Sequence, residues 1–404
     1  MTFSRLLPVA SLAALALGIA SCQEDLTAPG DCPGLCPSDN LVVADTVLEA
    51  VLDSTYTGFV QTGEGTRLLV ANGGAGEQLI GVARFARRGD SITVRDTAFA
   101  FLVDSVILGV TFERRDPAVT GLALEFYKLP AAIAVDTATS YAEVEAALTP
   151  ESLIRSVPIA DDFKSGSIRV VLAGPDLARI AFTEADTGVL RLAYRVTAPQ
   201  PTGVMLSSAA TGLPGPSFVS WVKVTRPDTT VVQGLPRIVA YDGFVDQTPT
   251  TSQPPDLISV GGAPSSRAIL RFNLPSRLRD SAQIIRATLQ LVPVGPVTGL
   301  PVDSALLDVR GIFSDLGPKS PRISTESLVR SELLTVGTGD SIFVEVTAVA
   351  RLWNTVSRPP TAFFLAMSPE ASTYVFVQFG SSRTPGAIPT LHLTYALPYR
   401  FEAQ

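Results

Sequence analysis

The sequence predicts an all-β protein: two tandem jelly-roll-like antiparallel β-sandwich domains with a few short helices. Three observations support this prediction, namely abundant turn residues, period-2 alternation of apolar residues, and an internal repeat. Gly 31 and Pro 31 among 404 residues imply frequent chain reversals and few long helices. Hydrophobic residues make up 46% of the chain, enough to fill ordinary protein cores, so wholesale disorder is excluded.

Alternating runs bounded by turn residues recur along the chain, which is the pattern of half-buried antiparallel strands. Expected strands include residues 91–110, 167–172, 284–292, 341–346 and 374–379. Helical patterns are scarce, and we expect short helices only at residues 141–148, 325–334 and 347–353. Segments with these features fit jelly rolls of about eight strands, whose ends the helices would close.

The chain contains two copies of one unit, at a spacing too long for a solenoid. The opening YTGFV at residues 56–60 recurs as YDGFV at residues 241–245. The clearest match is ESLIRS at residues 151–156 against ESLVRS at residues 326–331. The order of the matched segments never inverts, so we expect each copy to form its own sandwich. The predicted division is a signal peptide (1–21), a tether (22–44), copy one (45–224), a linker (225–235), copy two (236–397) and a tail (398–404).

The first residues have the features of a secretory signal peptide, with one positive charge in residues 1–5 and an apolar run over residues 6–18 that is too short to span a bilayer. The run ends in IASC at residues 19–22, which resembles the bacterial lipobox. This resemblance implies that Cys22 is acylated and anchors the chain to the lipid bilayer. In a Gram-negative envelope Gln23 favours the outer membrane. The alternative is that another peptidase cuts nearby and Cys22 merely ends the apolar run.

Cys32 and Cys36 lie within the proline-rich and glycine-rich tether. An exported protein enters an oxidising compartment, where the two thiols can form a local disulfide. A metal site would need two further soft ligands, and the neighbouring sequence supplies none. We therefore favour the disulfide over a metal site, with free thiols as the remaining alternative.

Composition excludes several classes of function. Lys+Arg 31 against Asp+Glu 38 leaves a net charge of −7, so the chain lacks the basic excess that nucleic-acid binding requires. His392 is the single histidine and no G-x-S-x-G motif occurs, so we expect no enzyme. We expect no cofactor and assign no metal ligands. Calcium stays open as an alternative at Asp161–Asp162 and at Asp242 with Asp246, as in other jelly-roll modules, although exposed loop carboxylates without a bound ion are the commoner explanation of such residues.

Copy two resembles the DNRLRE-type module nearly from end to end. The resemblance rests on RAILRFNLP (267–275), IRATLQL (285–291), VEVT (344–347) with Trp353, FGSSR (379–383) and PTLHLTY (389–395). That family is similar to disaggregatase-related repeats and to carbohydrate-binding modules. It implies a jelly-roll sandwich on a secreted or surface protein and binding of polysaccharide. Copy one departs from it where Ala181 stands opposite Trp353 and in its last strand.

Alternation in the last strand of each copy places Trp221 and Lys223, and likewise His392 and Thr394, on the face opposite the core. An exposed aromatic ring can stack on a sugar while polar neighbours orient it, so these four residues are the candidate ligand site. We expect a lipid-anchored, non-catalytic surface protein that binds polysaccharide or an envelope partner. The alternatives are a structural or adhesive surface protein without a small-ligand site and, third, a polysaccharide-acting enzyme.

Overall fold

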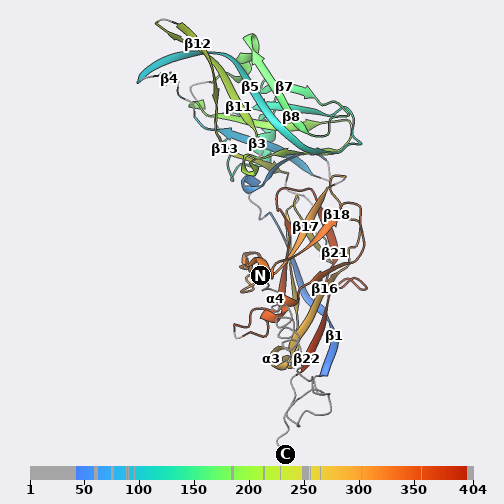
Figure 1. Cartoon of the computed structure of the whole chain (residues 1–404). Helices are drawn as coiled ribbons and strands as arrows, with labels where there is room; N and C mark the ends of the chain where they lie inside the picture. Colours follow the sequence, from blue (N-terminus) through green and yellow to red (C-terminus); the bar gives the residue numbers. More distant parts are fainter. Residues whose placement is uncertain are drawn as a thin grey trace, which may run out of the picture.

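The computed structural model describes residues 42–397, apart from gaps at 59–61, 74–76, 88, 90, 95, 183–185, 213, 228, 248–253, 255, 264, 302 and 356. Antiparallel strands dominate and form two jelly-roll-like sandwiches stacked end to end (Figure 1). The predicted all-β fold class is confirmed. Cys22, Cys32, Cys36 and the predicted tail lie outside the described residues. Within the described ranges no helix is long and apolar enough to cross a membrane.

The N-terminal sandwich is a 12-stranded sheet that runs in the order β12-β11-β5-β10-β2-β3-β9-β6-β7, with β13 beside β3 and with β4 and β8 beside β5. Its strands are β2 (Arg67–Asn72), β3 (Gln78–Phe85), β4 (Ser91–Val94), β5 (Thr97–Arg115), β6 (Ala123–Lys128), β7 (Leu153–Pro158), β8 (Gly166–Ala173), β9 (Leu190–Thr197), β10 (Thr202–Ser207), β11 (Ser217–Arg226), β12 (Thr229–Pro236) and β13 (Val239–Asp246).

The C-terminal sandwich is a 10-stranded sheet that runs in the order β18-β17-β20-β15-β1-β22-β16-β19, with β14 beside β15 and β21. Its strands are β1 (Val42–Thr57), β14 (Leu257–Gly261), β15 (Ser266–Phe272), β16 (Gln283–Leu291), β17 (Ser304–Gly311), β18 (Arg330–Thr335), β19 (Ile342–Glu345), β20 (Ala362–Ser368), β21 (Phe376–Gly380) and β22 (Thr390–Leu397).

The strand orders of the two sandwiches agree with the internal repeat. The run β13-β3-β9-β6-β7 in one corresponds to β1-β15-β20-β17-β18 in the other, and β12-β11-β5-β8 corresponds to β1-β22-β16-β19. The six-residue match leads into β7 in one copy and into β18 in the other, and both are edge strands. Matched sequence therefore occupies matched places in the two sheets.

The predicted boundaries of the two copies are wrong at their first strand. Residues 45–57 were expected to open copy one and residues 42–44 to belong to the tether, yet β1 pairs with β22 and β15 of the C-terminal sandwich. The expected linker and the start of copy two instead form β12 and β13, which pair with β11 and β3 of the N-terminal sandwich. A short turn connects β11 to β12 and keeps this segment at its neighbour. The positions beside β11 and β3 are then filled by β12 and β13, and β1 occupies the equivalent positions in the C-terminal sandwich.

Each sandwich encloses its own apolar core. In the C-terminal sandwich, Trp353 is 1% exposed and contacts Phe363 with ring centroids 5.0 Å apart. In the N-terminal sandwich, Phe126 and Tyr194 meet edge to face with centroids 5.6 Å apart. Trp353 is thus a core residue, as its pattern with Val349 and Leu352 indicates, and it is not part of a ligand surface.

A further buried cluster joins the two sandwiches. Leu69 and Met205 of the N-terminal sandwich pack against Leu300 and Tyr374 of the C-terminal sandwich. The Tyr374 hydroxyl donates a hydrogen bond to the carbonyl of Val204 at 3.0 Å, and burial raises the pKa of Tyr374 well above its usual value, which keeps the hydroxyl protonated as a donor. The joint between the sandwiches is therefore a packed interface with a directed hydrogen bond.

The three short helices that the sequence predicts have different outcomes. Helix α2 (Tyr141–Ala147) forms as expected, with a capping box between Ser140 and Glu143, and so does α4 (Thr347–Leu352). The expected helix at residues 325–334 is wrong: a single 3₁₀ turn at Glu326–Leu328 leads into β18. The edge of the sheet recruits this segment as a strand, because strand pairing satisfies more of its backbone than an isolated short helix would. Helix α3 (Ser276–Ser281) was not predicted.

Candidate functional site

Trp221 and Lys223 lie on the outer face of β11, between β5 and β12. The Trp221 side chain is 39% exposed, and its ring lies across Gly234 of β12, where an added Cβ would meet the indole at 3.5 Å. Lys223 forms an ion pair with Asp104 of β5. An aromatic ring and a charged pair therefore lie side by side on an open sheet face.

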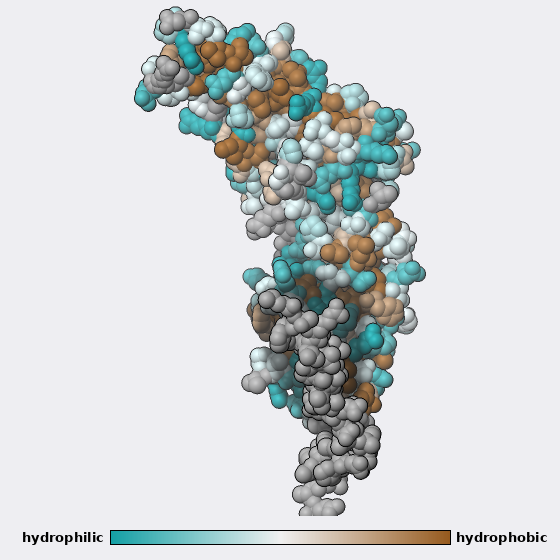
Figure 2. Space-filling model, viewed as in Figure 1, coloured by the Kyte–Doolittle hydropathy of each residue, from teal (hydrophilic) through white to brown (hydrophobic). Residues whose placement is uncertain are grey.

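Exposed aliphatic residues continue this face. Leu102 is 75% exposed, Val232 is 53% exposed and Val171 is 59% exposed. Leu102 and Val232 are the direct cross-strand neighbours of Lys223, whereas Val171 pairs with Ile107 further along β5. Figure 2 shows apolar surface over the part of the N-terminal sandwich where β5, β11 and β12 lie. We call Leu102, Val171, Trp221, Lys223 and Val232 the β11 face.

The aliphatic members of the β11 face were not predicted from the sequence. Val171 and Leu102 occur in alternating strands, where an aliphatic residue is normally assigned to the core. The signal that could have found them is phase, because Leu102 and Val171 alternate with residues that face inward, such as Val103 and Leu172. Exposed apolar groups gathered on one sheet face are typical of an interaction surface.

His392 and Thr394 lie at the corresponding place in the C-terminal sandwich, on the outer face of β22 between β1 and β16. The His392 ring nitrogen Nε2 is 3.0 Å from Oε1 of Gln290 and 3.2 Å from the Thr390 hydroxyl. The Thr394 hydroxyl donates to Asp45 at 2.6 Å. This face also carries exposed apolar side chains, because Val47, opposite His392, is 54% exposed and Phe343, opposite Gln290, is 55% exposed. The structure places the four predicted residues on two separate, equivalent faces and does not bring them into one site.

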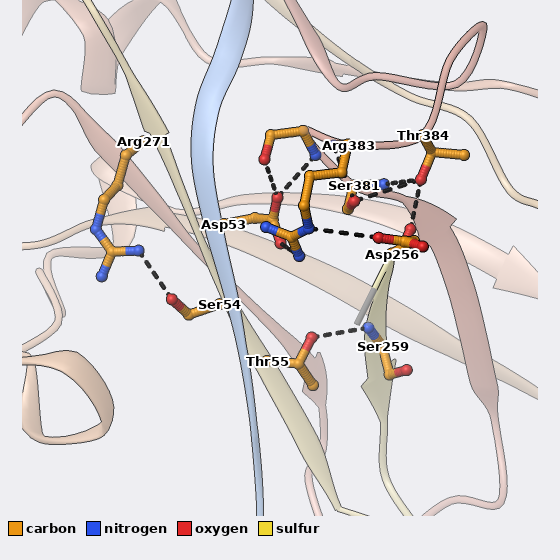
Figure 3. A network of polar contacts seen from close by, with 10 residues as sticks. Asp53, Ser54, Thr55, Asp256, Ser259, Arg271, Ser381, Arg383 and Thr384 are labelled. Carbon is orange, nitrogen blue, oxygen red and sulfur yellow. Dashed lines mark hydrogen bonds and ion pairs between the residues drawn. The ribbon is translucent and has the colours of Figure 1, made fainter. Parts of the chain in front are cut away.

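A buried carboxylate fixes β1 in the C-terminal sandwich (Figure 3). Asp53 is 7% exposed and accepts hydrogen bonds from the Ser382 backbone N–H at 2.7 Å and from its hydroxyl. The Arg383 guanidinium lies 3.2 Å from the other carboxylate oxygen. The FGSSR segment quoted for the family resemblance thus holds β1, because a buried carboxylate needs several donors to be stable.

Asp242 of β13 is the counterpart of Asp53. Asp242 lies opposite Ala83 of β3, and Asp53 lies opposite Leu270, the matched position of β15. Asp242 accepts a hydrogen bond from the Ala209 N–H at 2.8 Å. Burial raises the pKa of Asp242, while hydrogen bonds from Ala209 and Ser208 lower it. Both first strands are therefore held in the same way, and these carboxylates serve the fold.

The carboxylates considered for calcium have other partners or lie apart. Asp242 is bonded to Ala209, as above, and Asp161 accepts a hydrogen bond from the Gly121 N–H at 3.0 Å. Asp246 lies near the buried Glu77 and raises its pKa. In the part of the chain that the structure describes, no group of three or more His, Cys, Asp or Glu side chains is placed to hold a metal ion.

The raised pKa of Glu77 predicts that the stability of the protein depends on pH. Burial, and secondarily the charge of Asp246, raise this pKa to about 7. The folded chain then keeps a proton that the unfolded chain releases, so this contribution to stability is full below about pH 4.5 and is lost as pH rises toward 7. Glu77→Gln should remove the loss and stabilise the protein at pH 8 by about 1–2 kcal/mol.

Urea unfolding of wild type and of Glu77→Gln at pH 5 and at pH 8 measures this effect. Glu332→Gln on the exposed face of β18 is the matched control and should leave the pH dependence unchanged. If the free energy of unfolding changed between pH 5 and pH 8 by the same amount in wild type and in Glu77→Gln, the assignment would be contradicted.

Comparison with known proteins adds little. No family model matches the chain and no curated protein matches it. Among solved structures, a chain titled "Structure of infectious bursal disease virus Gx strain" matches with 12% sequence identity, over 90% of this chain and 79% of the other, at a TM-score of 0.15. At that score the likeness carries no argument, so function rests on the residues themselves.

Proposed function

We propose that this protein is a lipid-anchored, non-catalytic surface protein that binds polysaccharide through the β11 face. The observation that carries the proposal is the exposed Trp221 beside the Lys223–Asp104 pair on an open sheet. An indole ring offers a flat apolar surface to the C–H face of a sugar. The ammonium and carboxylate beside it can donate to and accept from sugar hydroxyls.

The course of the chain supports presentation of the β11 face away from an anchor at Cys22. Val42, the first residue of β1, pairs with Leu397 at the end of the C-terminal sandwich that points away from the N-terminal sandwich (Figure 1). From there β1 runs for 16 residues toward the N-terminal sandwich. An anchor preceding Val42 therefore leaves the C-terminal sandwich near the membrane and the β11 face at the distal end.

The surroundings of His392 support a non-catalytic role. Its Nε2 interacts with Gln290 and Thr390, and no carboxylate partner for this ring is recorded among the described residues. A catalytic histidine normally lies between a nucleophile and an orienting carboxylate. Polysaccharide hydrolysis remains the third candidate activity, without a residue pair that favours it.

A glycan array with the mature protein, followed by calorimetry on the best ligand, tests the proposal. Trp221→Ala should lower affinity about tenfold or more, because an aromatic anchor supplies much of the binding energy at such a surface. It should change the free energy of unfolding by less than about 1 kcal/mol, since the ring is partly exposed. Phe313→Ala, at a side chain that is 63% exposed on the C-terminal sandwich, is the matched control.

Unchanged affinity in Trp221→Ala would remove the β11 face as the glycan site. Loss of several kcal/mol of stability would instead indicate that Trp221 serves packing. No binding on the array would favour the second candidate, a structural or adhesive surface protein. That candidate is supported by Leu102, Val171 and Val232, whose exposed side chains also suit an apolar protein partner.

A further inference from the structure

The end of the C-terminal sandwich that points away from the N-terminal sandwich is rich in arginine. Helix α3 supplies Arg277 and Arg279, and the segment from α4 onward supplies Arg351 and Arg358. Asp280 is the single acidic residue in these two segments and pairs with Arg358 at 3.0 Å. This local basic excess contrasts with the net charge of −7 of the whole chain.

The same end receives the N-terminal tether. Ala396 of β22 lies opposite Val43 at the start of β1 and opposite Gln283 at the start of β16. Helix α3 immediately precedes Gln283, and Figure 1 shows α3 beside the ends of β1 and β22. The tether from Cys22 to Val42 spans at most on the order of 70 Å when extended, so an acylated Cys22 keeps this end within that distance of the bilayer.

This end also contains a hollow of about 300 Å³ with both polar and apolar walls, lined by Arg279, Asp280, Ser281, Ala282, Gln283, Asn354 and Ala396. The Asp280 carboxylate in this lining is paired with Arg358. Two atoms of the lining residues, Nε of Arg279 and Oδ1 of Asn354, have no hydrogen-bond partner among the described residues. Buried polar atoms are normally paired, so the wall holds unused hydrogen-bonding capacity. The volume is near the lower limit for small-molecule sites.

We propose that this end of the protein binds the phosphate headgroups of anionic phospholipids, with Arg277 and Arg279 as the principal contacts and the hollow as the headgroup site. The proposal rests on the lipid anchor of the proposed function. An acylated Cys22 tethers the chain to the bilayer, and a basic surface at the tethered end adds an electrostatic attraction to anionic headgroups. The two together hold the sandwich against the bilayer, with the β11 face outward.

The full-length chain with Cys22→Ala, which cannot be acylated at that residue, isolates the headgroup contribution. It should sediment with phosphatidylcholine vesicles that contain about one third phosphatidylglycerol, and not with pure phosphatidylcholine vesicles. High salt should release it, because screening weakens exposed charge pairs. If the bilayer surface is the ligand, inorganic phosphate at matched ionic strength should compete only weakly with vesicle binding. Full competition by phosphate would show that the hollow takes only the free anion, and it would overturn the lipid proposal.

The double variant Arg277→Glu with Arg279→Glu should lower the bound fraction about tenfold or more. Arg87→Glu with Arg169→Glu, which makes the same charge change at exposed sites of the N-terminal sandwich, is the control and should leave binding unchanged. Equal loss in both pairs, or equal binding to neutral vesicles, would overturn the proposal. If the double variant fails to fold, Arg277→Glu alone should still lower binding about fivefold.

The proposals of the anchor and of the headgroup site can be rejected independently of each other. Mass spectrometry of the wild-type N-terminus reports acylation of Cys22 independently of vesicle binding. Unacylated protein that still binds anionic vesicles would reject the anchor and keep the headgroup site. Acylated protein whose Cys22→Ala variant ignores anionic vesicles would reject the headgroup site and keep the anchor.

Discussion

Removal of residues 1–57 is expected to unfold the C-terminal sandwich and to leave the N-terminal sandwich folded. Strand β1 lies between β15 and β22, so its loss leaves one side of each of these two strands unpaired and removes Leu48 and Ala50 from the core. It also removes the Asp53 carboxylate, so that Ser382 and Arg383 lose this acceptor. The N-terminal sandwich keeps the two strands that are equivalent to β1, because β12 and β13 belong to it.

Limited proteolysis and two-dimensional NMR of the shortened chain measure this outcome. A chain that begins at Val42 is the matched control and should keep both sandwiches, since it retains all of β1. A synthetic peptide of residues 42–57 added to the shortened chain should restore protection of the C-terminal sandwich, and the Asp53→Ala peptide should do so less well. A shortened chain with both sandwiches intact would show that β1 is dispensable.

Asp303→Ala is expected to weaken the joint between the sandwiches and to destabilise the protein by about 2–4 kcal/mol. The Asp303 side chain is fully buried and lies 2.8 Å from the Arg114 guanidinium of the N-terminal sandwich. It also accepts hydrogen bonds from the Thr373 hydroxyl at 2.9 Å and from the Ser304 N–H at 2.9 Å. Alanine would remove the acceptor of the buried Thr373 hydroxyl and of the Ser304 N–H, and it would break the ion pair with Arg114.

Chemical unfolding followed by probes in each sandwich checks this expectation. Wild type should show coupled transitions, and Asp303→Ala should separate them, because the packed joint links the two folding units. Asp104→Ala also removes a carboxylate from a cation pair, but at an exposed site on the β11 face, so it should cost less than about 1 kcal/mol. Equal effects of the two substitutions would place the stabilising role of Asp303 in doubt.

Local pattern was sufficient to predict much of the architecture. Alternation in 167–172 and 284–292 predicted β8 and β16, and the helical pattern at residues 141–148 predicted α2. The ESLIRS and ESLVRS match predicted a duplication that the matched edge strands β7 and β18 bear out. These features depend on neighbouring residues, which is why the sequence reveals them directly.

Tertiary structure decided which sandwich each first strand completes. The strand orders show that β1 and the β12–β13 segment are equivalent, and two equivalent segments can fill two equivalent places. The hairpin from β11 to β12 settles the choice, because its short turn makes one pairing local and leaves the long-range place to β1. The similar openings at Tyr56 and Tyr241 are offset from the pairing that places Asp53 with Asp242.

The candidate site divides in the same way. The sequence by itself determined that Trp221 and Lys223 point away from the core and that His392 and Thr394 do so at the matching strand, because the side-chain period of a strand is two. Only the tertiary structure decided that Asp104, Leu102 and Val232 lie beside Trp221 and Lys223, and that α3 meets the start of β1. Such neighbours come from segments far apart in the chain, and their proximity is set by strand pairing rather than by any local pattern.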